Sequence, residues 1–186
     1  MALADWLQYQ IEEGEFRTLE LRSDKVYEGS KALFIDADEF LLIHKQTLID
    51  KPKNGALKTY FLFPKGKYSI AGAVFKADRD GNGLVIKVFE GGRVELWEAA
   101  GSTMNWMFDS NLDYSLSEET WFILEIICDD DNGVLTVRAK DKDENVLGET
   151  IVSSENWSSW RGISGGIGLY AEGTGIYYDL TKIYYP

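Results

Sequence analysis

The chain has 186 residues, of which 45% are hydrophobic, and this is enough for one domain with a sizeable core. Its 19 basic and 31 acidic residues give a net charge of -12, which argues against nucleic-acid and anionic-membrane partners because both are recognised by clustered Lys and Arg. No stretch approaches the roughly eighteen apolar residues that span a bilayer, so we expect no membrane insertion, and the expected partners are a glycan, a cation, another protein or a second copy of the chain.

Short apolar runs separated by turn signals predict an all-β chain. Six Trp, ten Tyr and nine Phe also favour strands over helices. The first run, residues 4–13, fits either a strand or one to two helical turns. The strands predicted after it cover residues 31–36, 39–45, 57–64, 67–78, 84–90, 93–99, 120–130, 134–141, 146–153 and 176–185.

Alternation along the chain supports a sheet with one solvated face. Leu135, Val137 and Ala139 point one way, while the polar residues between them point the other way. Residues 121–128 are apolar on both faces except at Glu125, which predicts a central strand. We therefore predict a single antiparallel domain over residues 1–186, with about a dozen strands in two sheets.

Four segments, taken in order, resemble sugar-binding jelly-roll domains. They are "VYEGSKALFID", "IAGAVFKADRDGNGLVIKVFEGGRVELWE", "ETWFILEIICDDDNGVLTVRAKDKDENVL" and "GGIGLYAEGTGIYYDLTKIYY". The chain is similar in this to the concanavalin A-like (laminin-G-like, lectin and glucanase) family. The resemblance implies a two-sheet antiparallel β-sandwich of the jelly-roll type. It implies less about function, because this fold hosts lectins, glycosidases, lyases and structural modules.

The resemblance also implies a structural calcium ion near the last strand. Asp179 occupies the place of a ligand, and the backbone carbonyls around Glu28 and Gly29 would be its partners. Calcium suits such a site, because it takes six to eight oxygen ligands and accepts carbonyls. The alternative is that Asp179 lies on the solvated face of an edge strand.

A second acidic segment, "DRDGNG", fits the first half of a calcium-binding loop through Asp78, Asp80 and Asn82. The twelfth position of such a loop needs Glu, and Phe89 is there instead. The flanking residues also read as strands, which excludes an EF-hand. Two interpretations remain: a hairpin turn, or an isolated cation loop.

Four tryptophans are candidates for ligand binding, because an indole face stacks on the C–H groups of a sugar ring. Trp97 and Trp106 lie in or near the polar segment 99–115, which reads as a loop. Trp157 and Trp160 lie in a second such segment, residues 153–162, beside Asn156 and Arg161. The alternative for Trp157 and Trp160 is that they cap the open end of the sandwich. The last segment of the chain, rich in Gly and Tyr, predicts close strand contacts and buried rings with bonded hydroxyls.

Residues for catalysis are sparse. The carboxylates do not have the spacing of a glucanase strand, and no serine-hydrolase or zinc-protease motif is present. Glu125 is either an acid with a raised pKa or a residue paired with Arg. Cys128, the only cysteine, lies in an apolar strand and is expected to be a buried, inert thiol. We therefore expect no enzyme activity.

These observations favour a non-catalytic, lectin-like module that recognises a neutral glycan through loop aromatics. The alternative is a structural subunit, such as the decoration or fibre protein of a virus or other particle, which would form a homo-oligomer. A polysaccharide-active enzyme is a weaker third interpretation. The start of the chain shows no secretory signal, so an extracellular module of a larger protein or a virion component is expected.

Overall fold

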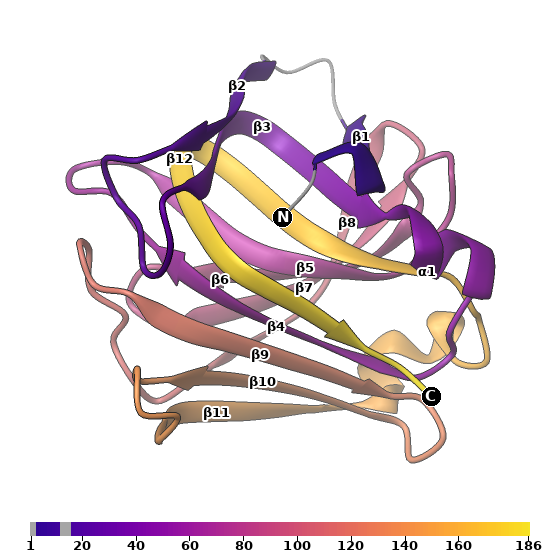
Figure 1. Cartoon of the computed structure of the whole chain (residues 1–186). Helices are drawn as coiled ribbons and strands as arrows, with labels where there is room; N and C mark the ends of the chain where they lie inside the picture. Colours follow the sequence, from indigo (N-terminus) through magenta and orange to yellow (C-terminus); the bar gives the residue numbers. More distant parts are fainter. Residues whose placement is uncertain (1–2, 12–15) are drawn as a thin grey trace.

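Twelve strands dominate the computed structural model, which describes residues 3–11 and 16–186. Every strand pair is antiparallel, and Figure 1 shows the strands stacked in two layers. The strands are β1 (Trp6–Gln10), β2 (Phe16–Arg22), β3 (Ala32–His44), β4 (Gly55–Leu62), β5 (Ser69–Ala77), β6 (Gly83–Phe89), β7 (Arg93–Ala100), β8 (Thr103–Asn111), β9 (Phe122–Asp129), β10 (Val134–Lys140), β11 (Val146–Ser153) and β12 (Gly166–Tyr184). The described helices are α1 (Lys45–Asp50) and two 3₁₀ segments, η1 (Leu3–Asp5) and η2 (Ser154–Trp160).

The two layers share the long strands β3 and β12, which bend from one layer into the other. The first layer contains β1, the second half of β3, the first half of β12, and β5 to β8. The second contains β2, the first half of β3, the second half of β12, and β4, β9, β10 and β11. The predicted antiparallel β-sandwich is confirmed.

Glycines make the bend of β12 possible. Gly173 and Gly175 have φ values of 99° and 127°, which side chains rarely adopt, and the pairing register shifts there. In Figure 1 the yellow ribbon of β12 reaches the upper left of the view and then folds back toward the C-terminus. Gly168 permits a close approach, because a Cβ there would lie 2.1 Å from the carbonyl oxygen of Leu42.

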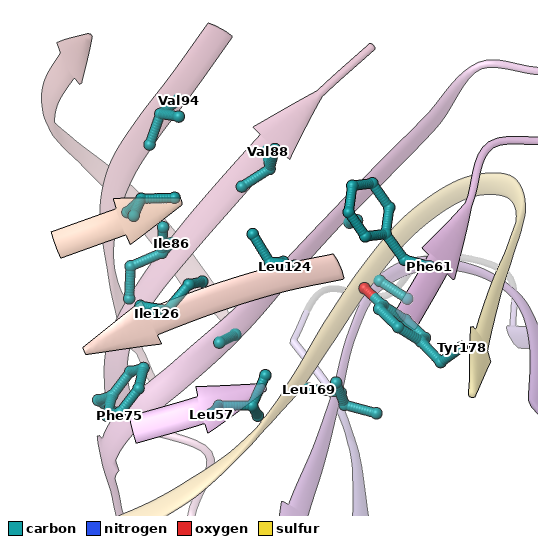
Figure 2. Close-up of a cluster of buried hydrophobic side chains, with 14 of the residues drawn as sticks. Leu57, Phe61, Phe75, Ile86, Val88, Val94, Leu124, Ile126, Leu169 and Tyr178 are labelled. Carbon is teal, nitrogen blue, oxygen red and sulfur yellow. The ribbon is translucent and has the colours of Figure 1, made fainter. Parts of the chain in front are cut away.

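The main core lies between the layers, where alternate residues of each strand point inward (Figure 2). Leu57, Leu124 and Ile126 of the second layer are fully buried there, as are Ile86 and Val88 of the first. Burial of these apolar side chains, at about 25 cal/mol per Å², is the main force that holds the layers together.

Tyr178 shows how the tyrosine-rich last strand packs. Its ring is fully buried, and its hydroxyl accepts a hydrogen bond from the Gly72 N–H at 2.9 Å. The same hydroxyl donates to the carbonyl of Tyr170, and burial raises the pKa of Tyr178. The expectation of buried rings with bonded hydroxyls is therefore confirmed for this residue.

Several predicted elements are found where expected. Leu135, Val137 and Ala139 are buried, and β9 lies centrally between β10 and β4. Residues 31–36 and 39–45, predicted as two strands, belong mainly to β3, which kinks at Glu39 with a φ of 43°. The first run is a strand over Trp6–Gln10, and residues 12–13 of that prediction lie outside the described residues.

One prediction about the loops is wrong. Much of segment 99–115, expected to be a loop, forms β8 at the edge of the first layer. Its polar side chains are compatible with a strand because most of them are exposed. No helix in residues 3–11 and 16–186 has the length and apolar character that a membrane crossing needs.

Candidate functional site

Trp157 and Trp160 close one end of the sandwich. Trp157 is fully buried, Trp160 is 8% exposed, and both belong to the main core. The indole N–H of Trp160 donates to Glu98 Oε1 at 3.0 Å, and that of Trp157 points to the carbonyl of Val152 at 3.5 Å. Trp157 therefore has no exposed face on which a sugar could stack, and the capping alternative describes both residues.

A buried ion pair fixes this cap to the strands. Lys76 Nζ lies 2.6 Å from Asp130 Oδ1, and each side chain is 1% exposed. The N–H of Gly162 donates to the same carboxylate at 3.0 Å, and Arg161 Nε lies 3.9 Å from it. Burial alone raises the pKa of Asp130, but the hydrogen bonds from Lys76 and Gly162 outweigh it and leave this pKa below its usual value. Arg161 thus contacts a structural carboxylate, and the neighbouring Asn156 is half-buried.

Trp97 and Trp106 lie together on the outer face of the first layer. They are direct partners on β7 and β8, so their side chains share one face of the sheet. Trp106 is 56% exposed, whereas Trp97 is half-buried. The indole N–H of Trp97 donates to Glu95 Oε2 at 2.8 Å, which fixes its ring.

Polar groups continue this face along the two strands. Glu95 is the partner of Asp109, and Arg93 is the partner of Asn111. Asp109 and Asn111 are exposed, and Arg93 forms an ion pair with Glu95. We call the surface formed by Trp97, Trp106, Glu95, Asp109 and Asn111 the tryptophan face. It combines an exposed indole with hydrogen-bonding groups that the sequence alone did not connect to it.

A buried lysine lies beside the tryptophan face, and the sequence analysis missed it. Lys87 Nζ lies 2.7 Å from Glu172 and 3.1 Å from Glu39. The same ammonium lies 4.5 Å from the centre of a Trp97 ring and 5.1 Å from that of Tyr170. The sequence feature that could have indicated this buried lysine is a single charged residue within the apolar run "LVIKVF". Lys87 thereby connects Glu39 of β3 and Glu172 of β12 to the Trp97 ring of β7.

Comparison with known structures finds similar folds over most of the chain. Carbohydrate binding module CBM66 from Bacillus subtilis has a TM-score of 0.60 at 11% identity, over 93% of this chain and 96% of that one. The cellulose induced protein Cip1 has a TM-score of 0.67 at 9% identity, over 99% and 93%. The fold is a two-sheet antiparallel β-sandwich of the jelly-roll type. No protein-family model and no curated protein sequence matches the chain.

A longer protein is also similar in structure over part of its length. The GH43 protein BlXynB from Bacillus licheniformis has a TM-score of 0.51 at 13% identity, and the match covers 83% of this chain but 33% of that one. The likeness is therefore to a part of that protein, and at these identities it shows the fold alone.

Asp179 joins the last strand to the loop before β3. Its carboxylate accepts hydrogen bonds from the backbone N–H groups of Tyr27 and Glu28, at 3.1 and 3.2 Å, and from that of Leu180 at 2.8 Å. These donors occupy three of the roughly four acceptor sites of the carboxylate, so the arrangement fits an anchor for residues 27–28 better than a metal site. Among the described residues no group of three His, Cys, Asp or Glu could hold a metal ion. Calcium at Asp179, with Glu28 and Gly29, stays a prediction.

The Asp78 segment is the hairpin turn between β5 and β6. Asp78 Oδ1 accepts hydrogen bonds from the N–H groups of Asp80 and Asn82, at 2.9 and 3.0 Å. Asp141 makes the same pair of bonds to Asp143 and Asn145, in the turn between β10 and β11. The same pattern in two turns indicates a local structural motif, in which the aspartate side chain accepts hydrogen bonds from the backbone N–H groups two and four residues later. A cation in the Asp78 loop stays a prediction.

The residues considered for catalysis have structural partners. Glu125 pairs with Lys140 at 2.8 Å and with Arg138 at 3.2 Å. Burial raises the pKa of Glu125, but these two cations outweigh burial and leave it lowered, which opposes a role as general acid. Cys128 is buried as expected, and burial raises the pKa of its thiol to about 11.

Proposed function

We propose that this chain is a non-catalytic domain that binds a neutral glycan on the tryptophan face. The observation that carries the proposal is the pairing of Trp106, 56% exposed, with the half-buried Trp97 on one face of two adjacent strands. The lectin-like fold, which it shares with a carbohydrate binding module, supports the same function without specifying a ligand.

The chemistry of the face suits a sugar. An exposed indole offers an apolar, electron-rich plane against which the C–H groups of a pyranose can pack. The carboxylate of Asp109 and the amide of Asn111 lie farther along the same face and can bind hydroxyl groups. The exposed carboxylate of Asp109 would repel an anionic sugar, whereas the charge of Glu95 is paired with Arg93, and the face therefore favours a neutral sugar.

Titration with a panel of neutral oligosaccharides, followed by calorimetry and by tryptophan fluorescence, tests this proposal. We expect binding to be lost in Trp106→Ala and retained in Tyr184→Ala. Tyr184 is a matched control because it is 52% exposed and lies on β12, away from β7 and β8. Binding that survives in Trp106→Ala, or a full panel without binding, would count against the tryptophan face as a glycan site.

The absence of catalysis is part of the proposal. Glu125 is held by Lys140 and Arg138, and Glu39 and Glu172 share the ammonium of Lys87. We therefore expect no turnover on a polysaccharide panel. Turnover that disappears in Glu125→Gln would instead show that Glu125 is a catalytic residue.

Assembly into a particle is the second candidate function, and the edge strand β11 favours it. Val146 and Ile151 are 52% and 59% exposed on this strand, and such apolar residues on a free edge can pair with another chain. Native mass spectrometry decides between the functions. A stable closed oligomer that Ile151→Lys converts to monomer, together with no sugar affinity, would favour assembly.

A further inference from the structure

Two tyrosine rings lie stacked against each other on the outer face of the second layer. The ring centroids of Tyr27 and Tyr60 are 3.9 Å apart, and the ring planes differ by 27°. The next closest pair of aromatic rings in the described residues, Phe34 and Tyr177, has its centroids 4.8 Å apart. Tyr27 and Tyr60 are therefore in van der Waals contact over their faces.

The register of the sheet brings these two rings together. Tyr60 points away from the main core, because the residues on either side of it in β4 are fully buried. The residue opposite Tyr60 on β12 is Asp179, and its carboxylate accepts the backbone N–H of Tyr27 at 3.1 Å. The loop between β2 and β3, residues 23–31, is thus anchored beside Tyr60, and it places one ring over the other.

The hydroxyl groups indicate that the two rings are stacked head to head. Burial and a hydrogen bond with Tyr27 raise the pKa of Tyr60 to about 12. A hydrogen bond raises the pKa of the phenol that donates it, so the O–H of Tyr60 donates to the oxygen of Tyr27. Because the hydroxyl ends are joined and the ring faces are in contact, the ring carbons beside the two hydroxyls are also brought together.

Both rings can be reached by an oxidant in solution. Tyr27 and Tyr60 are half-buried, whereas Tyr170 and Tyr178 are fully buried. Cys128 is the only cysteine and is buried, so no disulfide can form within the chain. A covalent link between distant parts of this chain therefore has to come from other side chains, and the stacked phenols have the geometry for one.

We propose that Tyr27 and Tyr60 form an oxidative cross-linking site, at which a one-electron oxidant, a haem peroxidase with hydrogen peroxide, joins the two rings as dityrosine. Each phenol loses one electron and one proton, and the two radicals form a carbon–carbon bond between the positions beside their hydroxyls. The hydrogen on each bonded carbon then moves to the oxygen of its own ring, which restores both phenols. Hydrogen peroxide takes up the two electrons and two protons and becomes two molecules of water.

The cross-link fastens the loop of residues 23–31 to the second layer. Linked rings lie side by side and not face to face, so the Tyr27 ring has to turn, which its place on a loop allows. The link also closes the chain between residues 27 and 60, and a closed loop lowers the entropy of the unfolded chain. The cross-linked protein should therefore melt at a higher temperature. The tryptophan face lies on β7 and β8, so this inference does not rest on the proposed function.

The test is oxidation of the dilute full chain by a haem peroxidase and hydrogen peroxide, followed by proteolysis and mass spectrometry. We expect one pair of peptides joined through residues 27 and 60, lighter by two hydrogens than the separate peptides. Its yield should not depend on protein concentration, because the link forms within one molecule. Tyr27→Phe and Tyr60→Phe keep the ring but should each abolish the link. Tyr68→Phe is the matched control, because Tyr68 is 62% exposed, and it should leave the link unchanged.

Several results would overturn the proposal. One is a set of links confined to the exposed Tyr68 and Tyr184, with a yield that rises with protein concentration. Another is a link between residues 27 and 60 that forms equally well in urea, because the folded stack would then have no part in it. A linked chain that melts at the temperature of the unlinked chain would contradict the fastening of the loop. A thermal melt of each variant before oxidation confirms that it is folded.

Discussion

Two tryptophan pairs look alike in the sequence and have opposite roles in the structure. Trp157 and Trp160 lie in η2 and are buried in the core, whereas Trp106 is 56% exposed beside Trp97 on β8 and β7. The segments that hold or adjoin these pairs, residues 99–115 and 153–162, are both polar, irregular and rich in Ser and Asn. The difference is set by distant partners: Trp160 binds Glu98, which is 62 residues away along the chain. Exposure, and with it the capacity to bind, is therefore a tertiary property of each pair.

The largest expected effect is the loss of the cap. Trp157→Ala removes a fully buried indole from the core, and such changes cost about 3–5 kcal/mol through lost burial and the cavity that remains. Urea unfolding, followed by circular dichroism, measures this loss. A cost below about 1 kcal/mol would show that η2 does not contribute to the core as described.

The next effect comes from the ion pair beneath the cap. Asp130→Asn leaves Lys76 buried without its carboxylate, which costs about 3 kcal/mol. Because the folded-state pKa of Asp130 is lowered, its contribution is present above the unfolded pKa and is lost as pH falls through the folded pKa. The difference between wild type and variant should therefore shrink below about pH 4.

Urea unfolding at a series of pH values measures this dependence. Asp80→Asn is the control, because Asp80 is exposed and forms no ion pair with a described residue. A difference between wild type and Asp130→Asn that stays constant down to the acid limit of folding would contradict the assigned role of the Lys76–Asp130 pair.

Much of the fold follows from local pattern. Alternation at Leu135, Val137 and Ala139 predicted the buried face of β10, and the doubly apolar run around Glu125 predicted the central position of β9. The strand β8 could not be found in this way. Its sequence, "TMNWMFDSN", has no regular alternation because the register shifts at Trp97, and its edge position leaves most of its side chains in solvent.

The candidate sites were less predictable than the fold. Residue type identified Trp97 and Trp106 as candidates, but only the strand register puts Asp109 and Asn111 on the same face. A cleft of about 450 Å³, lined by Trp6, His44 and residues 178–183, has no sequence signal, because its walls come from two layers and from residues more than a hundred positions apart. The bends of β3 and β12, which pass from one layer to the other, bring these residues together.

A smaller effect is expected at the anchor of the loop before β3. Asp179→Ala leaves the N–H groups of Tyr27 and Glu28 without their acceptor, which costs about 1–2 kcal/mol. An N–H anchor predicts the same loss in melting temperature with calcium and with a chelator. The calcium prediction instead requires that calcium raise the melting temperature of the wild type and have no effect on Asp179→Ala, so one thermal-shift series distinguishes the two.

The smallest expected effect on stability completes the comparison of the two tryptophan pairs. Trp106→Ala removes a side chain that is already 56% in solvent, so its unfolding free energy should change by no more than about 0.5 kcal/mol. The same variant should lose the glycan binding proposed for this face. Trp160→Phe, which keeps an aromatic ring in the cap but removes the N–H bonded to Glu98, should show the reverse: a loss of about 1 kcal/mol with binding unchanged. If the two variants lose stability and binding in parallel, the separation of cap from binding face is wrong.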